Sequence, residues 1–412
     1  MTAKKGVRLS FVLVLALALG VGGGVARDAA AKKSQWVAAW GFSIQGLSTT
    51  EVNDRTLRMI ARPTVSGSAV RVRIDNTFGT SPLLIGQAAF AVRNNGAQLV
   101  PGSTRPLLFS GSAMVTIPAG GGVYSDPLSY EIDAWQDVAV SLYVPPQGAR
   151  ASRHGNARTT SFVSIPGNHT SEETSASFPS TSPTTTTTEM LLVSAIDVSS
   201  TAKGAVVFLG DSITDGTATT TDGHDRWHDV LYLRRLLDPG PGAGPKDDQD
   251  LAFVNEGIGG NRVTNVIPGA SPAAVDRLDR DVLARTGIVK VVFFEGTNDL
   301  AANVTADQLM AGMQNIIDRV HAQHLKIVGA TIIPRSNTTW TAQMTAYRHQ
   351  VNDWIQHKAR FDGVIDFDRV MRDATNPDIM APRLEFGDHI HPNPFGYLLM
   401  GQSVNMALIE RD

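Results

Sequence analysis

Cysteine is absent from the 412-residue chain. The protein therefore has no disulfide and no cysteine for a lipid anchor, so its stability must come from a packed core. An excess of charge of one sign is also lacking, because 36 Lys and Arg residues stand against 39 Asp and Glu residues. This balance provides no field that would attract nucleic acid or an anionic membrane, and we predict neither as a partner.

Long apolar runs are confined to the start of the sequence. A basic segment at residues 4–8 precedes an apolar stretch at 9–25, and small residues follow at 26 and at 29–31. This layout predicts a secretory signal peptide over residues 1–31, with an uncleaved anchor as the alternative, and hence an extracellular or periplasmic protein. Later segments do not reach the ~20 apolar residues of a membrane-spanning helix, so no stable span is expected after signal removal.

Residues 34–200 have the pattern of antiparallel β-structure. SAVRVRIDN at 68–76 and DVAVSLYV at 137–144 alternate apolar and polar side chains, and clusters rich in Gly, Pro and Asn separate such runs. A period of two with frequent turn residues predicts a β-rich, sandwich-like module. Within it, residues 170–189 contain few large apolar side chains, which predicts an exposed Ser/Thr-rich loop.

The pattern changes after residue 203. Apolar strand-like runs now alternate with amphipathic helical stretches, which predicts an α/β domain over residues 203–412 with a parallel sheet covered on both faces. The strand-like runs are residues 204–210, 251–257, 288–296 and 325–334, and the clearest helical stretches are 226–237 and 305–324. Ligands of such sheets bind at the carboxyl ends of the strands.

Polar or glycine-rich turns follow three of these strands, and a histidine-containing segment lies near the C-terminus. The turns are GDS at 210–212, NEGIGGNRV at 255–263 and GTND at 296–299, and the segment EFGDHIHPNPFGY spans 385–397. These residue types are those of an acyl-transfer site. Ser212 would attack a carbonyl, His391 would take and return its proton, and Asp388 would orient the imidazole.

In this order, GDSITDG, GIGGNRV, GTND and DHIH resemble the four sequence blocks of the GDSL or SGNH hydrolase superfamily of esterases and acylhydrolases. The resemblance implies a three-layer α/β/α, flavodoxin-like hydrolase domain with Ser212 as nucleophile and Asp388 and His391 as its partners. It also implies an oxyanion hole formed by the N–H groups of Ser212 and Gly260 and the side-chain amide of Asn298. Gly259 is the alternative to Gly260, since only one can direct its N–H to the oxyanion.

Phrases in the first half extend the resemblance. WVAAWGFS, AVRVRIDNTFGTSPLLIG and DGHDRWHDVL are similar to a bacterial branch of the superfamily that carries a β-rich module before the hydrolase domain. Members of that branch are described as arylesterases or xylan-associated esterases. This similarity implies a substrate with small acyl groups on a sugar or an aryl alcohol, either a small molecule or a polysaccharide ester.

The sequence therefore predicts a secreted serine esterase that needs no cofactor or metal, and it leaves the oligomeric state open. A lipase or phospholipase acting on long acyl chains is one alternative. A glycan-binding protein with a vestigial hydrolase domain is another, although no proposed catalytic position is lost.

Several polar residues near the predicted site have simpler interpretations. His389 is an alternative base beside His391, Asp211 is expected to hold its turn by a hydrogen bond, and Asp215 is a candidate helix cap. Two pairs of histidines have metal-ligand spacing, but no third ligand is placed by the sequence and a solvated helix surface is the better interpretation. These pairs are His224 with His228 and His321 with His324.

Overall fold

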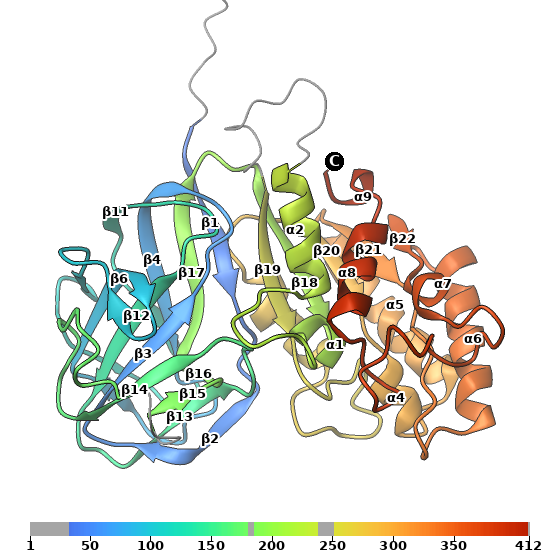
Figure 1. Cartoon of the computed structure of the whole chain (residues 1–412), viewed down its shortest axis with the longest axis horizontal. Helices are drawn as coiled ribbons and strands as arrows, with labels where there is room; N and C mark the ends of the chain where they lie inside the picture. The colour runs from blue at the N-terminus through green and yellow to red at the C-terminus, as the bar shows by residue number, and fades with distance from the viewer. Residues whose placement is uncertain (1–32, 180–184, 238–250, 411–412) are drawn as a thin grey trace, which may run out of the picture. The chain divides into compact units, whose positions relative to one another are not determined.

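The computed structural model describes residues 33–179, 185–237 and 251–410 (Figure 1). The predicted signal peptide at 1–31 and part of the Ser/Thr-rich loop, 180–184, lie outside these residues. Among the helices of the described ranges, none is long and apolar enough to cross a membrane. Ser34–Asp412 forms one compact unit, and its division into two domains near residue 200 stays a prediction.

The first part of this unit is β-rich, as predicted, and its strands pair antiparallel. The strands are β1 (Gln35–Gly41), β2 (Gly46–Val52), β3 (Arg55–Ala61), β4 (Gly67–Asp75), β5 (Leu83–Ile85), β6 (Gln87–Asn95), β7 (Gln98–Leu99), β8 (Arg105–Leu107), β9 (Val115–Ile117), β10 (Gly122–Tyr124), β11 (Leu128–Ile132), β12 (Val138–Val144), β13 (Ala149–His154), β14 (Ser161–Pro166), β15 (Thr186–Thr187), β16 (Met190–Leu191) and β17 (Val193–Ser200).

Two larger sheets enclose the core of the β-rich part. One has the order β1-β17-β4-β10 with β11 also paired to β4, and the other has the order β15-β14-β3-β12-β6-β7 with β8 paired to β6. Shorter ladders join β16-β13-β2 and β5-β9. Along β4 the alternation has the predicted effect, since Val70, Val72 and Ile74 are fully buried while Arg71 and Arg73 are partly exposed.

The Ser/Thr-rich loop packs more closely than the sequence predicts. Phe178 is only 1% exposed, and the guanidinium of Arg58 lies 4.0 Å from the centre of its ring. Arg58 also donates to the carbonyl oxygen of Glu172, and β15 pairs with β14. The predicted exposure is therefore wrong at Phe178, because one aromatic residue and a buried arginine anchor a segment of otherwise small polar residues.

The second part contains α/β structure. Its strands are β18 (Gly204–Gly210), β19 (Leu251–Gly257), β20 (Ile288–Phe294), β21 (Lys326–Ala330) and β22 (Gly363–Ile365). Its helices are α1 (Ser212–Asp215), α2 (Trp227–Leu237), α3 (Ala274–Leu278), the π-helical turn η1 (Asp279–Leu283), α4 (Thr297–Ala301), α5 (Ala306–Ala322), α6 (Ala342–His357), α7 (Phe367–Met371), α8 (Pro394–Ser403) and α9 (Ala407–Glu410).

These strands form the predicted parallel sheet, in the order β19-β18-β20-β21-β22. β22 has no signal in the sequence, because its three residues are too short for a period to show. Every residue of β18 is buried, which explains its continuous apolar run.

Alternate residues of β18 belong to different hydrophobic clusters. Phe208 packs edge-on against Trp227 of α2, with 5.1 Å between ring centres, whereas Val207 and Leu209 lie in the cluster that includes Leu309 of α5. The flavodoxin-like three-layer description stays a prediction.

The two parts share backbone and side-chain hydrogen bonds beside β19. The N–H of Phe253 donates to the hydroxyl of Thr64 at 2.8 Å, and the N–H of Ala38 in β1 donates to the carbonyl oxygen of Thr286 at 2.9 Å. Buried residues of β1, β17, β18 and β19 also belong to one hydrophobic cluster. The β-rich part therefore packs directly against the edge of the parallel sheet that carries the glycine-rich turn.

Candidate active site

Ser212 is the first residue of α1, directly after β18. The side chain of Asp211 caps this short helix by accepting the N–H of Ile213 at 2.9 Å, which is the turn-holding role predicted for it. A side chain at Gly210 would meet the hydroxyl of Thr214 and the carbonyl oxygen of Phe294, so only glycine fits where the strand ends. The turn thus holds Ser212 in one backbone conformation, 6% exposed.

Asp211 lies in a buried acidic environment beneath the serine. The pKa of its carboxyl is raised to about 7, mainly by burial and also by the neighbouring Asp299 and Asp215, while the hydrogen bond from Ile213 and the charge of Arg335 oppose the rise. Glu295, 1% exposed, has no hydrogen-bond partner for either carboxyl oxygen among the described residues. Burial therefore holds the pKa of Glu295 well above its usual range.

The structure brings Ser212, His391 and Asp388 into one chain of contacts. The Oγ atom of Ser212 lies 2.8 Å from Nε2 of His391, and Nδ1 of His391 lies 2.6 Å from Oδ2 of Asp388. Because a carboxylate accepts the Nδ1–H, the Nε2 atom is the one that can accept the serine proton. This geometry suits a base next to an alcohol nucleophile.

A short closed loop holds the acid and the histidine. The N–H of Phe386 donates to the carbonyl oxygen of His391 at 2.9 Å, and Oδ1 of Asp388 accepts the N–H groups of Ile390 and His391, each at 2.9 Å. Burial by itself would raise the pKa of Asp388, but the hydrogen bonds from the side chain and backbone of His391 hold it below its usual value. The carboxylate is thus ionised where it faces the imidazole.

His389, the alternative base, points elsewhere. Its Nδ1 atom lies 2.9 Å from Oε2 of Glu385, and its side chain is 57% exposed. The contact with Ser212 belongs to His391.

The glycine-rich turn after β19 gives its two adjacent glycines different environments. The N–H of Gly259 donates to Oδ2 of Asp215 at 3.0 Å. Gly260 has a φ of 72°, which favours glycine, and within the described part of the chain its N–H has no acceptor. Gly260 is therefore the glycine whose N–H is available to a substrate oxygen.

Asn298 and Asp299 connect the third strand end to this turn. The side-chain amide of Asn298 donates to the carbonyl oxygen of Asn261 at 2.9 Å. Asp299 accepts the N–H groups of Val263 and Thr264 at 2.8 and 3.0 Å, and the hydroxyl of Thr264 at 3.0 Å. The carboxylate thus holds the far end of the turn. This role has no signal in the sequence, since nothing in GTND identifies the partner of its last residue.

Two further residues of the site were not recognised from sequence. Arg335 donates to the side-chain oxygen of Asn298 at 3.4 Å, a contact that no motif signals. Asp215 is not the predicted helix cap but the last residue of α1, where it accepts the N–H of Gly259 and contacts His154 of β13. The cap interpretation failed because Asp215 is 4% exposed and its partners come from other segments.

The histidine pairs with metal-ligand spacing have other roles. His228 is 5% exposed, so the predicted solvated surface is wrong there, and its Nε2 atom lies 3.2 Å from the carbonyl oxygen of Thr214. Burial lowers the pKa of His228 to about 4. His321 contacts Asp362 at 2.9 Å. No group of three or more potential metal ligands occurs among the residues that the structure describes.

Comparison with known proteins finds a family that is similar to the second part of the chain. Residues 208–399 match the GDSL-like Lipase/Acylhydrolase family. Residues 208–399 are therefore similar to that family of ester hydrolases. A search of curated proteins found no match.

Solved structures similar to part of the chain include a lipase/acylhydrolase from Enterococcus faecalis, with 20% identity, 50% of this chain and 92% of that chain covered, and a TM-score of 0.37. An acetyl xylan esterase from Geobacillus stearothermophilus is also similar, with 18% sequence identity and a TM-score of 0.38. That match covers 51% of this chain and 95% of the esterase chain. A GDSL-like lipase from Bacteroides thetaiotaomicron has 18% identity, 50% and 88% coverage, and a TM-score of 0.35.

Proposed function

We propose that this protein is a serine esterase that hydrolyses carboxylic esters through an acyl-enzyme on Ser212. The observation that carries the proposal is the continuous contact from the Ser212 hydroxyl through the His391 imidazole to the Asp388 carboxylate. Such a chain converts a weak nucleophile into an effective one, because proton removal accompanies attack.

In the first half-reaction, Ser212 Oγ bonds to the ester carbonyl carbon while its proton passes to Nε2 of His391. The tetrahedral intermediate then expels the alcohol, which receives that proton from the imidazolium. In the second half-reaction a water attacks the acyl-enzyme with the same base, and the acid leaves as Ser212 regains its proton. Asp388 stabilises the imidazolium in both steps.

The oxyanion would be held by the N–H groups of Ser212 and Gly260 and by the side-chain amide of Asn298. Asn298 donates one amide hydrogen to Asn261, which orients the amide group and leaves its second hydrogen for the substrate. Preorganised donors of this kind are worth about 3 kcal/mol each in the transition state. The proposed reaction needs no metal or cofactor.

For the substrate, we propose short acyl groups on a sugar or an aryl alcohol, in a small molecule or a polysaccharide. The similarity of the N-terminal phrases to the two-module bacterial branch supports this choice. We also propose secretion after loss of residues 1–31 and the flavodoxin-like layering of residues 203–412. N-terminal sequencing of exported protein would test the first of these.

The central test is a panel of aryl esters of increasing acyl length together with acetylated glycans, measured by acid release. Wild-type protein should prefer short acyl chains, and Ser212→Ala should abolish turnover while a fluorophosphonate labels only the wild type, at Ser212. Full turnover by the Ser212→Ala variant would refute the nucleophile. A preference for long acyl chains would favour the lipase alternative, and glycan binding without any hydrolysis would favour the binding protein.

A further inference from the structure

His154 links the β-rich part to the helix that carries the serine. It is the last residue of β13 and is fully buried. Its Nδ1 atom lies 2.9 Å from the carbonyl oxygen of Ser43, and its Nε2 atom lies 3.0 Å from Oδ1 of Asp215. Phe42 stacks on the ring with 4.5 Å between centres. The imidazole is thus fixed in position on three sides.

Both ring nitrogens of His154 face oxygen acceptors. A backbone carbonyl can only accept, so Nδ1 carries a hydrogen, and the contact with Asp215 then requires a second proton shared between Nε2 and the carboxyl. His154 therefore retains a proton that an isolated histidine would lose at neutral pH.

The surrounding charges favour this protonated pair. Burial by itself would lower the pKa of His154, but the charge and hydrogen bond of Asp215 and the Ser43 carbonyl outweigh it and raise the pKa above the usual value. The charged group that opposes the rise is Arg226, which precedes α2 and donates to the carbonyl oxygen of Asp215 at 2.7 Å. Asp215 and Arg226 are thus the charged groups that contribute most to the pKa of His154.

Asp215 transmits this contact to the glycine-rich turn. One of its oxygens meets His154, and the other accepts the N–H of Gly259, the neighbour of Gly260. A displaced Asp215 would release the N–H of Gly259, and the turn would lose the anchor nearest to the proposed oxyanion donor.

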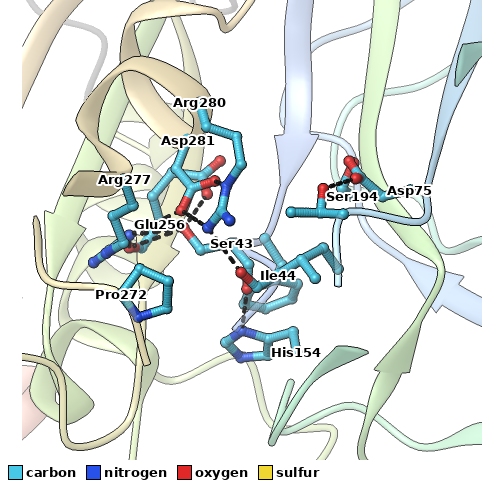
Figure 2. A network of polar contacts seen from close by, with 12 residues as sticks. Ser43, Ile44, Asp75, His154, Ser194, Glu256, Pro272, Arg277, Arg280 and Asp281 are labelled. Carbon is cyan, nitrogen blue, oxygen red and sulfur yellow. Dashed lines mark hydrogen bonds and ion pairs between the residues drawn. The ribbon is translucent and has the colours of Figure 1, made fainter. Parts of the chain in front are cut away.

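A second connection reaches the same turn through Ser43, as Figure 2 shows. The hydroxyl of Ser43 donates to Oε2 of Glu256 at 2.6 Å and accepts from Nη1 of Arg277 at 2.8 Å. Arg277, which is fully buried, also donates to the side-chain oxygen of Asn261 at 2.8 Å and to the carbonyl oxygen of Gly210 at 3.1 Å. The segment after β1 therefore contacts Glu256, before the turn, directly and Asn261, at its other end, through Arg277.

We propose that His154 is a positioning residue of the esterase site, through which the β-rich part holds the turn at 257–261 so that the Gly260 N–H stays available to the substrate. The proposal rests on the esterase function proposed above. Its consequence is that the first part of the chain completes the hydrolase site, and that deprotonation of His154 slows the reaction. A raised histidine pKa places this loss on the alkaline side, because the contribution is present below the pKa and disappears as pH rises through it.

The test uses the full chain and compares His154→Ala, His154→Gln and His169→Gln. His169 is the matched control, because it also pairs with a carboxylate, Glu172, but within the β-rich part. We expect His154→Ala to lower kcat about 10- to 100-fold with little change in KM, since a small misplacement of catalytic groups has effects of this size. His154→Gln retains a donor toward Asp215 without a titrating proton. The His154→Gln variant should therefore keep most of the activity but show no decline of activity at alkaline pH. The His169→Gln control should keep the wild-type activity and also the alkaline decline.

A second readout is independent of turnover. Amide hydrogen exchange of the peptide at 257–263 is compared in Ser212→Ala and in Ser212→Ala with His154→Ala, and we expect faster exchange in the double variant. Unchanged exchange together with an unchanged kcat would overturn the proposal, as would an alkaline decline that persists in His154→Gln. If the alanine variant does not fold, the glutamine pH profile decides. Turnover that does not depend on Ser212 would reject the esterase mechanism, while the exchange comparison still decides the positioning role.

Discussion

Oδ2 of Asp388 lies 2.6 Å from Nδ1 of His391, and the other carboxyl oxygen accepts the backbone N–H of the same histidine at 2.9 Å. One carboxylate thus fixes both the tautomer and the orientation of the imidazole. The opposite ring nitrogen is left to contact Ser212 at 2.8 Å. The two contacts define which way a proton can move through the site.

The first prediction concerns this pair. His391→Ala and Asp388→Asn should each lower kcat by about 10³- to 10⁴-fold, because the first removes the base and the second favours the wrong tautomer. Steady-state kinetics with an activated short-chain ester measures both. His389→Ala is the control, since His389 contacts Glu385 instead of the serine, and it should behave like the wild type. A large loss in the control alone would assign the base to His389.

The second prediction concerns the oxyanion donor. Asn298→Ala should reduce kcat by about 10²- to 10³-fold and leave KM nearly unchanged, because the amide contacts charge that develops in the transition state. Asn315→Ala, on the exposed side of α5, serves as the control. An effect on KM alone would show that Asn298 binds the ground state instead.

The third prediction concerns the anchor of the glycine-rich turn. Asp299→Asn replaces one of the two accepting oxygens by an amide nitrogen, which cannot accept a hydrogen bond. The backbone N–H of Val263 or of Thr264 then loses its acceptor. Leaving such buried groups unpaired costs about 1–3 kcal/mol, so the free energy of unfolding should fall by about that amount and kcat should fall with it. Urea unfolding and steady-state kinetics check the two effects, with Asp307→Asn on the surface of α5 as control. Unchanged stability would contradict the anchoring role.

The fourth prediction concerns Glu295, whose carboxyl is buried without a partner in the described part of the chain. Because its pKa is raised, the folded state holds a proton that the unfolded state loses above about pH 4.3. The stability of the wild type therefore falls as pH rises from that value toward the raised pKa. Glu295→Gln removes this contribution and should gain stability relative to the wild type by up to about 1.4 kcal/mol per pH unit in that window.

Denaturant unfolding at pH 5 and pH 7 measures the effect of Glu295→Gln. Glu131→Gln, on an exposed position of β11, is the control. Its free energy of unfolding should differ from that of the wild type by the same amount at both pH values. If the difference in free energy of unfolding between Glu295→Gln and the wild type does not change with pH, the Glu295 carboxyl is already ionised.

Local patterns were sufficient to predict much of the fold. The alternation in β4 and the continuous apolar run of β18 were correctly assigned, because burial on one face or on both leaves a period that a short segment shows. The helix predicted at 305–324 corresponds to α5, where Thr305 and Gln308 form a capping box. By contrast, Phe178 was assigned to an exposed loop, since a lone aromatic residue has no period.

The candidate site likewise contains residues that the sequence indicates and residues that only the structure shows. Ser212, Asp388 and His391 were singled out because their residue types suit one reaction and because the carboxyl ends of parallel strands must share an edge. Gly260 and Asn298 were added as oxyanion donors by the resemblance to the GDSL or SGNH superfamily. The contacts of Asp215 with His154, 61 residues away, and of Ser43 with Glu256, 213 residues away, had no such signal. Residue order therefore specifies which chemistry the chain carries. Packing of the β-rich part against β19 decides which distant groups hold that chemistry in place, because the partner of a buried polar group is set by three-dimensional proximity and leaves no period in the sequence.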